Sequence, residues 1–258
     1  NLTGTTIALI DAADDGTSTL NLDSLTAAQT ISAAITASED GLGNVTVSNT
    51  GGTVTFSETI GSHSTNLSVG TVSLAASSTT VFNKAVDSAA ITATTTASST
   101  FNAAVTNSGA ITTGVGSTTV FDSTVSSATL SNSGAMTLKG AVTLSGTMTT
   151  VSGSTITLGS AFKAGSAAAI TAASTSVGTL DQTVNAVTVN VNNQFTTGTV
   201  VLFKNTAAAL DSDDLASFNV TDTAIVDYTA ALSSTAKAIE ITANKRTTAG
   251  IATYLGMS

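Results

Sequence analysis

Two groups of carboxylates are the clearest candidates for chemistry in this sequence. They are Asp11, Asp14 and Asp15 near the start of the chain, and Asp211, Asp213 and Asp214 near its end. Carboxylates and loop carbonyls are the ligands that calcium prefers, so either group could hold this ion. Neither group matches an EF-hand loop or the glycine-rich repeat of calcium-loaded β-rolls. The favoured interpretation is a solvated acidic turn with no metal and no cofactor, and calcium at the second group stays an open alternative.

His63 is the only histidine, and the chain has no cysteine. A zinc site needs three or four nitrogen or sulfur ligands, so we expect no zinc and assign His63 to the polar surface. Paired carboxylates can also cleave glycosidic bonds. Such sites usually add aromatic and basic side chains, but the only tyrosines are Tyr228 and Tyr254, and the seven basic residues are scattered. We therefore expect no enzyme and no catalytic residue. The alternative is a carbohydrate-binding or carbohydrate-cleaving β-helix, such as a phage tail spike.

The overall charge argues against two classes of partner. The chain carries a formal net charge of −9. Nucleic-acid binding needs clustered lysine and arginine, and anionic membrane surfaces attract basic segments. No run of 18 apolar residues is present, so we expect no membrane insertion. The sequence begins at Asn1 without an initiator methionine or a signal peptide. We expect either a removed leader or a piece of a longer protein.

The elements that would position any site come from a repeat that runs from about position 79 to position 146. Its anchors are Phe82, Phe101, Phe121 and Leu138, whose positions differ by 19, then 20, then 17. Each anchor is followed four positions later by valine, as in Phe101-Asn102-Ala103-Ala104-Val105. A period near 20 in a chain rich in Thr, Ser and Val predicts a β-solenoid, in which each repeat is one coil. We therefore predict an all-β fold, a right-handed parallel β-solenoid (β-helix) of roughly 19-residue coils, with a β-rich C-terminal cap.

The repeat also divides the chain and orients its side chains. We predict an N-terminal β-rich cap at 1–41, solenoid repeats at 42–180 in about seven coils, and a C-terminal β-rich capping segment at 181–258. Val, Ile, Leu and Phe are expected to point into the core, with Phe82, Phe101 and Phe121 in one column, while Thr and Ser point out. The complete absence of proline fits a chain in which almost every residue lies in or beside a strand ladder.

Outside the repeat the pattern predicts several further elements. Residues 22–38 fit either a short helix or two weak strands, with strand favoured for Thr30–Ala37. A helical turn is expected within Ala207–Ser217, and a hairpin joins Ala224–Leu232 to Ala236–Ala243. The end of the chain, Thr248–Leu255, fits a short helix or an irregular cap.

The Phe/Leu-x-x-Ala/Thr-Val coils resemble the passenger repeats of bacterial autotransporter and filamentous-haemagglutinin-type surface proteins. The segments Phe218–Tyr228 and Ala238–Arg246 resemble the closing segment of such repeat regions. The resemblance covers residues 42–250. It implies an extracellular or cell-surface protein whose membrane-embedded translocator is not part of this sequence.

The expected function is that of a non-enzymatic extracellular structural protein: a surface filament or lattice subunit, or an adhesin stalk. Residues Thr3–Ile10 resemble Thr197–Lys204, 194 positions later, which suggests that copies join head to tail through solenoid edges. A contact of this kind does not close, so it yields a filament, and deleting residues 1–10 is expected to abolish it. A cell-surface or glycan receptor is left open as a second partner.

Overall fold

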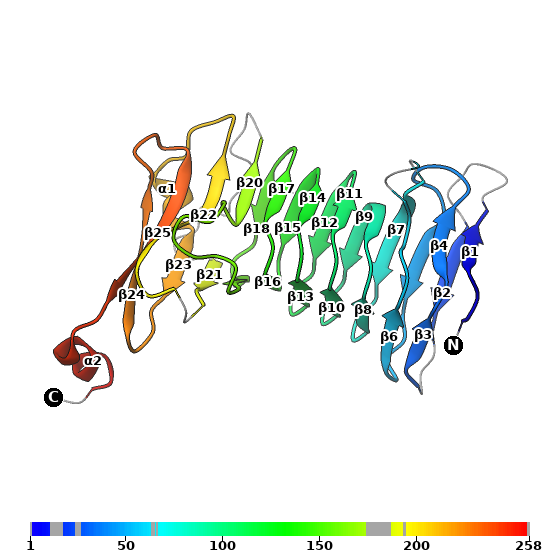
Figure 1. Cartoon of the computed structure of the whole chain (residues 1–258), viewed down its shortest axis with the longest axis horizontal. Coiled ribbons are helices and arrows are strands. Elements are labelled where there is room, and N and C mark those ends of the chain that lie inside the picture. Colours follow the sequence, from blue (N-terminus) through cyan, green and yellow to red (C-terminus); the bar gives the residue numbers. More distant parts are fainter. Residues whose placement is uncertain are drawn as a thin grey trace.

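The computed structural model describes residues 2–10, 18–23, 27–62, 65, 67–173, 187–192 and 195–256. Within these residues the chain is all-β apart from two short helices. The strands stack along one axis, and the two termini lie at opposite ends of the resulting rod (Figure 1). Long parallel sheets of this kind confirm the all-β prediction and are consistent with a solenoid.

A nine-stranded parallel sheet, called face 1 below, runs along the rod. In chain order its strands are β3 Gln29–Ile31, β6 Thr53–Phe56, β8 Thr79–Phe82, β10 Ser98–Phe101, β13 Thr118–Phe121, β16 Ala135–Leu138, β19 Thr155–Leu158, β21 Val187–Asn190 and β23 Phe218–Thr221. The register keeps the repeat anchors level, because Phe56 pairs with Phe82, Phe82 with Phe101, and Phe101 with Phe121.

Two further rows of strands complete the coils. Face 2 contains β1 Thr6–Leu9, β4 Ala34–Ala37, the start of β9 Val86–Ala93, β11 Val105–Asn107, β14 Val125–Ser127, β17 Val142–Leu144, β20 Ile170–Ala172 and β22 Gly198–Asn205. Face 3 contains β2 Thr19–Leu22, β5 Asn44–Val47, β7 Val69–Leu74, the end of β9, β12 Ala110–Thr113, β15 Thr129–Asn132 and β18 Met148–Thr150. The single strand β9 belongs to both rows.

The number of sequence positions between a residue and its aligned partner on the next strand varies along face 1. From Phe82 through Phe101, Phe121 and Leu138 to Leu158, the sequence positions of successive partners differ by 19, 20, 17 and then 20. The difference rises to 26 between Phe56 and Phe82 and to 33 between Ile156 and Val189. The strands nevertheless pair in register on both sides of these longer intervals. As a result, the described part of 42–180 places six strands on face 1, where seven coils were expected.

The phenylalanine column confirms the predicted core. The rings of Phe56, Phe82, Phe101 and Phe121 stack with centroids 5.0, 4.5 and 5.2 Å apart, and each residue is at most 1% exposed. The interplanar angles are 3°, 7° and 19°, so successive rings are nearly parallel. Leu138 continues the same register, since it pairs with Phe121. The anchors of the repeat are therefore inward residues of face 1.

The prediction that Thr and Ser point outward is wrong for a set of core positions. Ser99 Oγ donates a hydrogen bond to Thr119 Oγ1 at 3.1 Å, and Thr113 Oγ1 donates one to Asn132 Oδ1 at 2.7 Å. All four residues are buried. Residues two apart on a strand share a face, so Thr119 must follow Phe121 into the core. For Ser99 and Thr113 the next coil supplies the hydrogen-bond partner that a buried hydroxyl needs.

The C-terminal region changes from parallel to antiparallel pairing. Strand β22 pairs with β25 Ala238–Lys245, which pairs with β24 Val226–Leu232, and both contacts are antiparallel. This confirms the predicted hairpin. The predicted helical elements are α1 Ser212–Ala216 and α2 Thr248–Tyr254. In α2 the Thr247 hydroxyl caps the helix by accepting a hydrogen bond from the Gly250 amide.

The N-terminal segment takes the second of its two predicted forms. Strands β3 and β4 are separated at Ser32 and Ala33 and belong to different faces, because β3 pairs with β6 and β4 pairs with β1. The strand interpretation of residues 30–37 is thus correct, with a corner inside it. The cap and repeat boundaries at residues 41 and 180 stay predictions.

Candidate functional site

The residues that the sequence singled out divide into those outside and those inside the described structure. His63 and the group Asp11, Asp14 and Asp15 lie outside the described residues. The second aspartate group lies at the start of α1. There, Asp211 Oδ1 accepts hydrogen bonds from the amides of Asp213 and Asp214 at 2.9 and 3.0 Å. In return, Asp214 Oδ2 accepts one from the Asp211 amide at 2.9 Å. The two carboxylates thus form a capping box for a short helix.

The capping hydrogen bonds occupy one carboxylate oxygen of Asp211 and one of Asp214. Asp214 is buried, and the loss of solvation raises the pKa of its carboxyl group despite the hydrogen bond from Asp211. Within the described residues, no three His, Cys, Asp or Glu side chains gather in the manner of a metal site. The structure therefore gives the acidic turn a structural role in starting α1.

A hollow of about 280 Å³ brings together two other carboxylates that the sequence did not single out. Asp40 accepts hydrogen bonds from both the amide and the hydroxyl of Ser68, and Asp87 lies opposite the Thr106 position of the next coil. Asn107 also lines the hollow. Carboxylates among hydroxyl and amide groups can accept hydrogen bonds from sugar hydroxyls or from the water around a cation. The hollow is therefore a candidate for a small-ligand site on the side of the rod.

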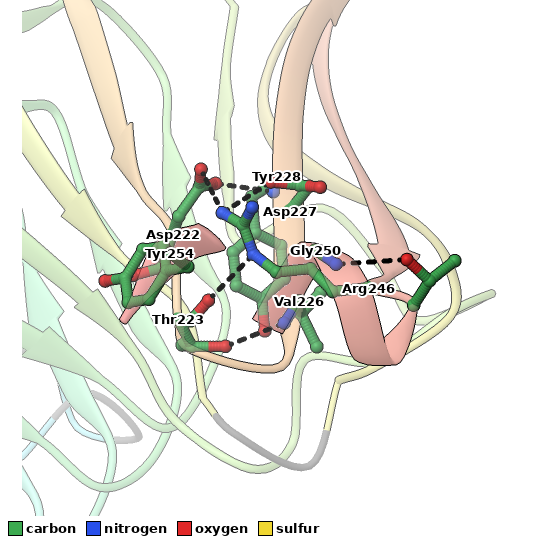
Figure 2. A network of polar contacts seen from close by, with 9 residues as sticks. Asp222, Thr223, Val226, Asp227, Tyr228, Arg246, Gly250 and Tyr254 are labelled. Atoms are coloured by element: carbon green, nitrogen blue, oxygen red, sulfur yellow. Dashed lines mark hydrogen bonds and ion pairs between the residues drawn. The ribbon is translucent and has the colours of Figure 1, made fainter. Parts of the chain in front are cut away.

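A second polar cluster, around Arg246, joins α2 to the last hairpin (Figure 2). The guanidinium forms ion pairs with the carboxylates of Asp222 and Asp227, and its Nε donates a hydrogen bond to the Thr223 carbonyl at 3.3 Å. It also lies over the ring of Tyr254, with Cζ 4.6 Å from the ring centroid. Three charges and one aromatic face thus meet where β25 leads into α2.

Tyr228 extends this cluster into the core. Its amide donates a hydrogen bond to Asp222 Oδ1 at 2.8 Å, and its hydroxyl donates one to the Phe195 carbonyl at 2.7 Å. Burial, with the charge of Asp222 adding to it, raises the pKa of the Tyr228 phenol. The polar groups of the cluster are thus engaged within the protein, and the cluster acts as a clasp. It fixes the start of β24, the end of β25 and α2 relative to one another.

Sequence reasoning missed both clusters because their members are far apart in the chain. One signal was available for each. Asp87 occupies a repeat position where the next two coils have Thr106 and Ser126, so it stands out as a charge where its neighbouring coils have small hydroxyl side chains. Arg246 is the only arginine in a chain with very few charges, and arginine is the preferred basic residue for partly buried ion pairs.

The ends of the rod form a third kind of candidate site. Among the described residues, β1 pairs only with β4, β23 only with β21, and β24 only with β25. Large hydrophobic side chains are exposed there: Leu2 and Ile10 beside the first strands, and Ile225, Tyr254 and Leu255 beside the last. Only Val115 and Val151 are comparably exposed elsewhere in the described chain. Unpaired edges and apolar exposure therefore coincide at both ends.

Comparison with models of known protein families and with curated protein sequences finds no match to this chain. The resemblance to autotransporter passengers thus stays an expectation drawn from the repeat. Neither helix in the described part of the chain has the length and apolar run that a bilayer crossing requires.

Proposed function

We propose that this protein is a non-enzymatic extracellular structural protein, a filament or lattice subunit or an adhesin stalk, in which copies join end to end. The observation that carries the proposal is the coincidence of unpaired strands and exposed apolar side chains at the two ends. A free strand edge is a template for pairing with another chain, and contacts between different surfaces of identical subunits extend without closing.

Burial of apolar side chains favours such a contact, whereas the net charge of the protein opposes it. Ile10 is 68% exposed beside β1, and Leu255 is 54% exposed beside α2. Burying these side chains in a contact removes apolar surface from water, which favours association by about 25 cal/mol per Å² of that surface. With a net charge of −9, whole copies repel one another at low ionic strength. Association should therefore strengthen as salt screens the repulsion.

The finer description of the fold belongs to the same proposal. We assign a right-handed solenoid with central coils of roughly 19 residues, because connections between parallel strands of one sheet are right-handed in about 98% of cases. Short coils and stacked rings produce a stiff rod suited to a spacer. The resemblance of the repeats to surface proteins supports an extracellular or cell-surface location.

The decisive experiment compares two substitutions of similarly exposed apolar residues. Ile10→Asp places a charge at the N-terminal end, whereas Val115→Asp places one at a corner in the middle of the rod, where Val115 is 63% exposed. Sedimentation velocity over a range of protein and salt concentrations, with electron microscopy, measures assembly. We expect filaments for the intact chain and for Val115→Asp, and monomers for Ile10→Asp. An intact chain that stays monomeric at high concentration contradicts the proposal.

A second candidate function is supported by the hollow that contains Asp40 and Asp87. A carbohydrate-binding or carbohydrate-cleaving β-helix would use these carboxylates for sugar hydroxyls. A screen of soluble polysaccharides for binding and for cleavage products tests this, with Asp87→Asn as the matched variant. Turnover that Asp87→Asn abolishes would establish this second function in place of the structural one.

A further inference from the structure

The last hairpin returns face 2 to the strand direction of the solenoid. From β1 to β22 the strands of face 2 run parallel to one another. Strand β25 is antiparallel to β22, and β24 is antiparallel to β25. The two reversals cancel, so β24 runs in the same direction as β1. Within the described chain it is also the outermost strand of face 2 at the C-terminal end (Figure 1).

Strand β24 has the inward and outward alternation of a solenoid strand as well. Tyr228 is buried, and Ala230 and Leu232 are half-buried, whereas Thr229 and Ala231 between them are exposed. Its even-numbered residues therefore continue the core, and its odd-numbered residues continue the outer surface. In both direction and facing, the last strand of face 2 is equivalent to the strands of the regular coils.

The pairing of β24 with β25 determines which backbone groups reach its open edge. The Arg246 amide donates a hydrogen bond to the Ile225 carbonyl at 2.9 Å, and the Ser233 amide donates one to the Ala238 carbonyl at 2.8 Å. In an antiparallel pair, hydrogen-bonded residues alternate with residues whose N–H and C=O groups point the other way. The odd-numbered residues of β24 therefore bond to β25, and the even-numbered ones turn their N–H and C=O groups to the open edge.

Part of this edge is closed by the turn that precedes β24. The Val226 amide donates to Thr223 Oγ1 at 3.1 Å, and the Val226 carbonyl accepts a hydrogen bond from the Thr223 amide at 3.0 Å. The Tyr228 amide donates to Asp222 Oδ1 at 2.8 Å. The open stretch thus begins at the Tyr228 carbonyl and continues to the end of the strand.

Strand β1 presents the complementary edge at the other end of the rod. The Leu9 carbonyl accepts a hydrogen bond from the Ser38 amide, which follows β4, at 3.0 Å. Alternate residues of a parallel strand bond to the same neighbour, so Ile7 and Leu9 bond to β4. Thr6 and Ala8 then turn their N–H and C=O groups to the open edge, and their side chains are exposed. The side chains of Ile7 and Leu9 face the core.

We propose that β24 of one copy pairs in parallel with β1 of the next copy, with Ala230 level with Ile7 and Leu232 level with Leu9. Inward side chains then meet inward ones, whereas a shift of one residue would turn them to opposite faces. Face 2 makes the contact because it gains β25 between β22 and β24, while face 1 ends at β23. This pairing depends on the end-to-end association proposed above and identifies the strands that form it.

The same register satisfies the open backbone groups of both strands. The Thr6 amide donates to the Tyr228 carbonyl, and the Ala230 amide donates to the Thr6 carbonyl. The Ala8 amide in turn donates to the Ala230 carbonyl, and the Leu232 amide donates to the Ala8 carbonyl. Moving β1 two residues toward the start of β24 would require the Tyr228 amide, which the preceding turn already binds. The closed part of the edge therefore selects one register.

Engineered disulfides test this register, because the chain contains no cysteine. Ala8 and Ala231 are both exposed, and the proposed pairing sets them side by side on strands about 4.8 Å apart, within the reach of a disulfide. A chain with both Ala8→Cys and Ala231→Cys should therefore form a ladder of covalent oligomers when oxidised in air. The matched control combines Ala8→Cys with Thr143→Cys, since Thr143 is an exposed residue of face 2 in the middle of the rod. On non-reducing electrophoresis we expect at least tenfold more trimers and larger species than in the control.

Sedimentation velocity distinguishes failure of this pairing from failure of the end-to-end association. An intact chain that stays monomeric at high concentration contradicts both. Filaments whose cysteine ladder does not exceed that of the control overturn the pairing of β24 with β1 and leave the end-to-end association standing. A stronger ladder from Thr6→Cys combined with Ala231→Cys overturns the register.

Proline variants provide an independent test that needs no cross-link. Ala230→Pro and Ala8→Pro each remove an amide that faces an open edge, a position where a strand tolerates proline. Circular dichroism checks that both variants fold. Each variant keeps one intact end, so we expect monomers from either alone and dimers from an equal mixture. A mixture of the two folded variants that stays monomeric overturns the proposal, as do filaments formed by either variant alone.

Discussion

Replacing Phe101 by aspartate is the most direct test of how the rod is held together. Phe101 is 1% exposed and lies between the rings of Phe82 and Phe121, at centroid distances of 4.5 and 5.2 Å. Truncating a buried phenylalanine to alanine typically costs about 3–5 kcal/mol. A carboxylate in the same place adds the cost of a buried, unpaired charge, so Phe101→Asp should destabilise the protein more than Phe101→Ala.

Three companion variants separate the contributions to this loss. Phe101→Leu reproduces the residue that Leu138 supplies in the same column. It should cost about 2–3 kcal/mol, from a small packing change and the loss of two ring stacks. Phe101→Asn has nearly the shape of the aspartate variant without its charge. Thr100→Asp changes the neighbouring outward residue and should cost less than about 0.5 kcal/mol.

The charge contribution also predicts a dependence on pH. Burial should raise the pKa of the carboxyl group that Phe101→Asp introduces above its unfolded value of about 3.9. Below that value the group is protonated in both states, so Phe101→Asp and Phe101→Asn should be similarly stable. As the pH rises through the folded pKa, the aspartate variant should lose stability relative to the asparagine variant.

Thermal unfolding followed by circular dichroism measures the series. For a chain of this size about 1 kcal/mol corresponds to about 2–4 °C, so Phe101→Asp should lower the unfolding midpoint by roughly 10 °C or more. From highest to lowest, the midpoints should follow the order Thr100→Asp, Phe101→Leu, Phe101→Ala and then Phe101→Asp. If Phe101→Asp unfolds at the same temperature as Thr100→Asp, the inward register of β10 is wrong.

Three further predictions concern the C-terminal region. Asp211→Ala should cost about 1 kcal/mol, because it removes the acceptor that caps α1, and chelators should change the unfolding midpoint of the intact chain little. Burial raises the folded pKa of Asp214, so the stability that its protonation contributes is fully present below about pH 3.9 and is lost as the pH rises through the folded pKa. Unfolding of Asp214→Asn should lack this part of the pH dependence. Arg246→Gln removes the ion pairs with Asp222 and Asp227 and should release α2. Hydrogen exchange should then speed up in 248–254 and stay slow in the core strands, whereas unchanged exchange in α2 would contradict the clasp.

The repeat made the core of this fold predictable from the sequence. Alternation along a strand determines which residues share a face, and the period near 20 places Phe82, Phe101 and Phe121 level. The same alternation puts Thr80 on the inner face with Phe82, where it is 1% exposed. The expectation that every threonine points outward conflicts with that rule. The position of a residue along the strand, and not its side-chain type, determines which face of the sheet it occupies.

Other features had no periodic signal to reveal them. The longer intervals between aligned partners, such as the one from Ile156 to Val189, follow no pattern in the sequence. The contact between Arg246 and Asp222 joins residues 24 positions apart through a change from parallel to antiparallel pairing. Asp40 and Asp87 line the same hollow although they lie in different coils. Such contacts depend on the completed coil, whereas the core depends on a local repeat.

The parallel stack also changes what a deletion at the N-terminus can show. Residues 1–10 include Leu2, which bridges Ile31, and β1, which pairs with β4. Removing them leaves β4 and Ile31 as the new unpaired edge, of the same kind as the old one. Each coil of such a rod covers the strand edge of the coil behind it, so removing the first coil exposes another unpaired edge. A charge such as Ile10→Asp leaves the pairing of β1 with β4 in place and changes only what the end offers to a neighbour. In a rod of stacked coils, changing the terminal side chains therefore tests assembly while leaving the strand pairing in place. Deleting the terminal strand does not, because it exposes another edge of the same kind.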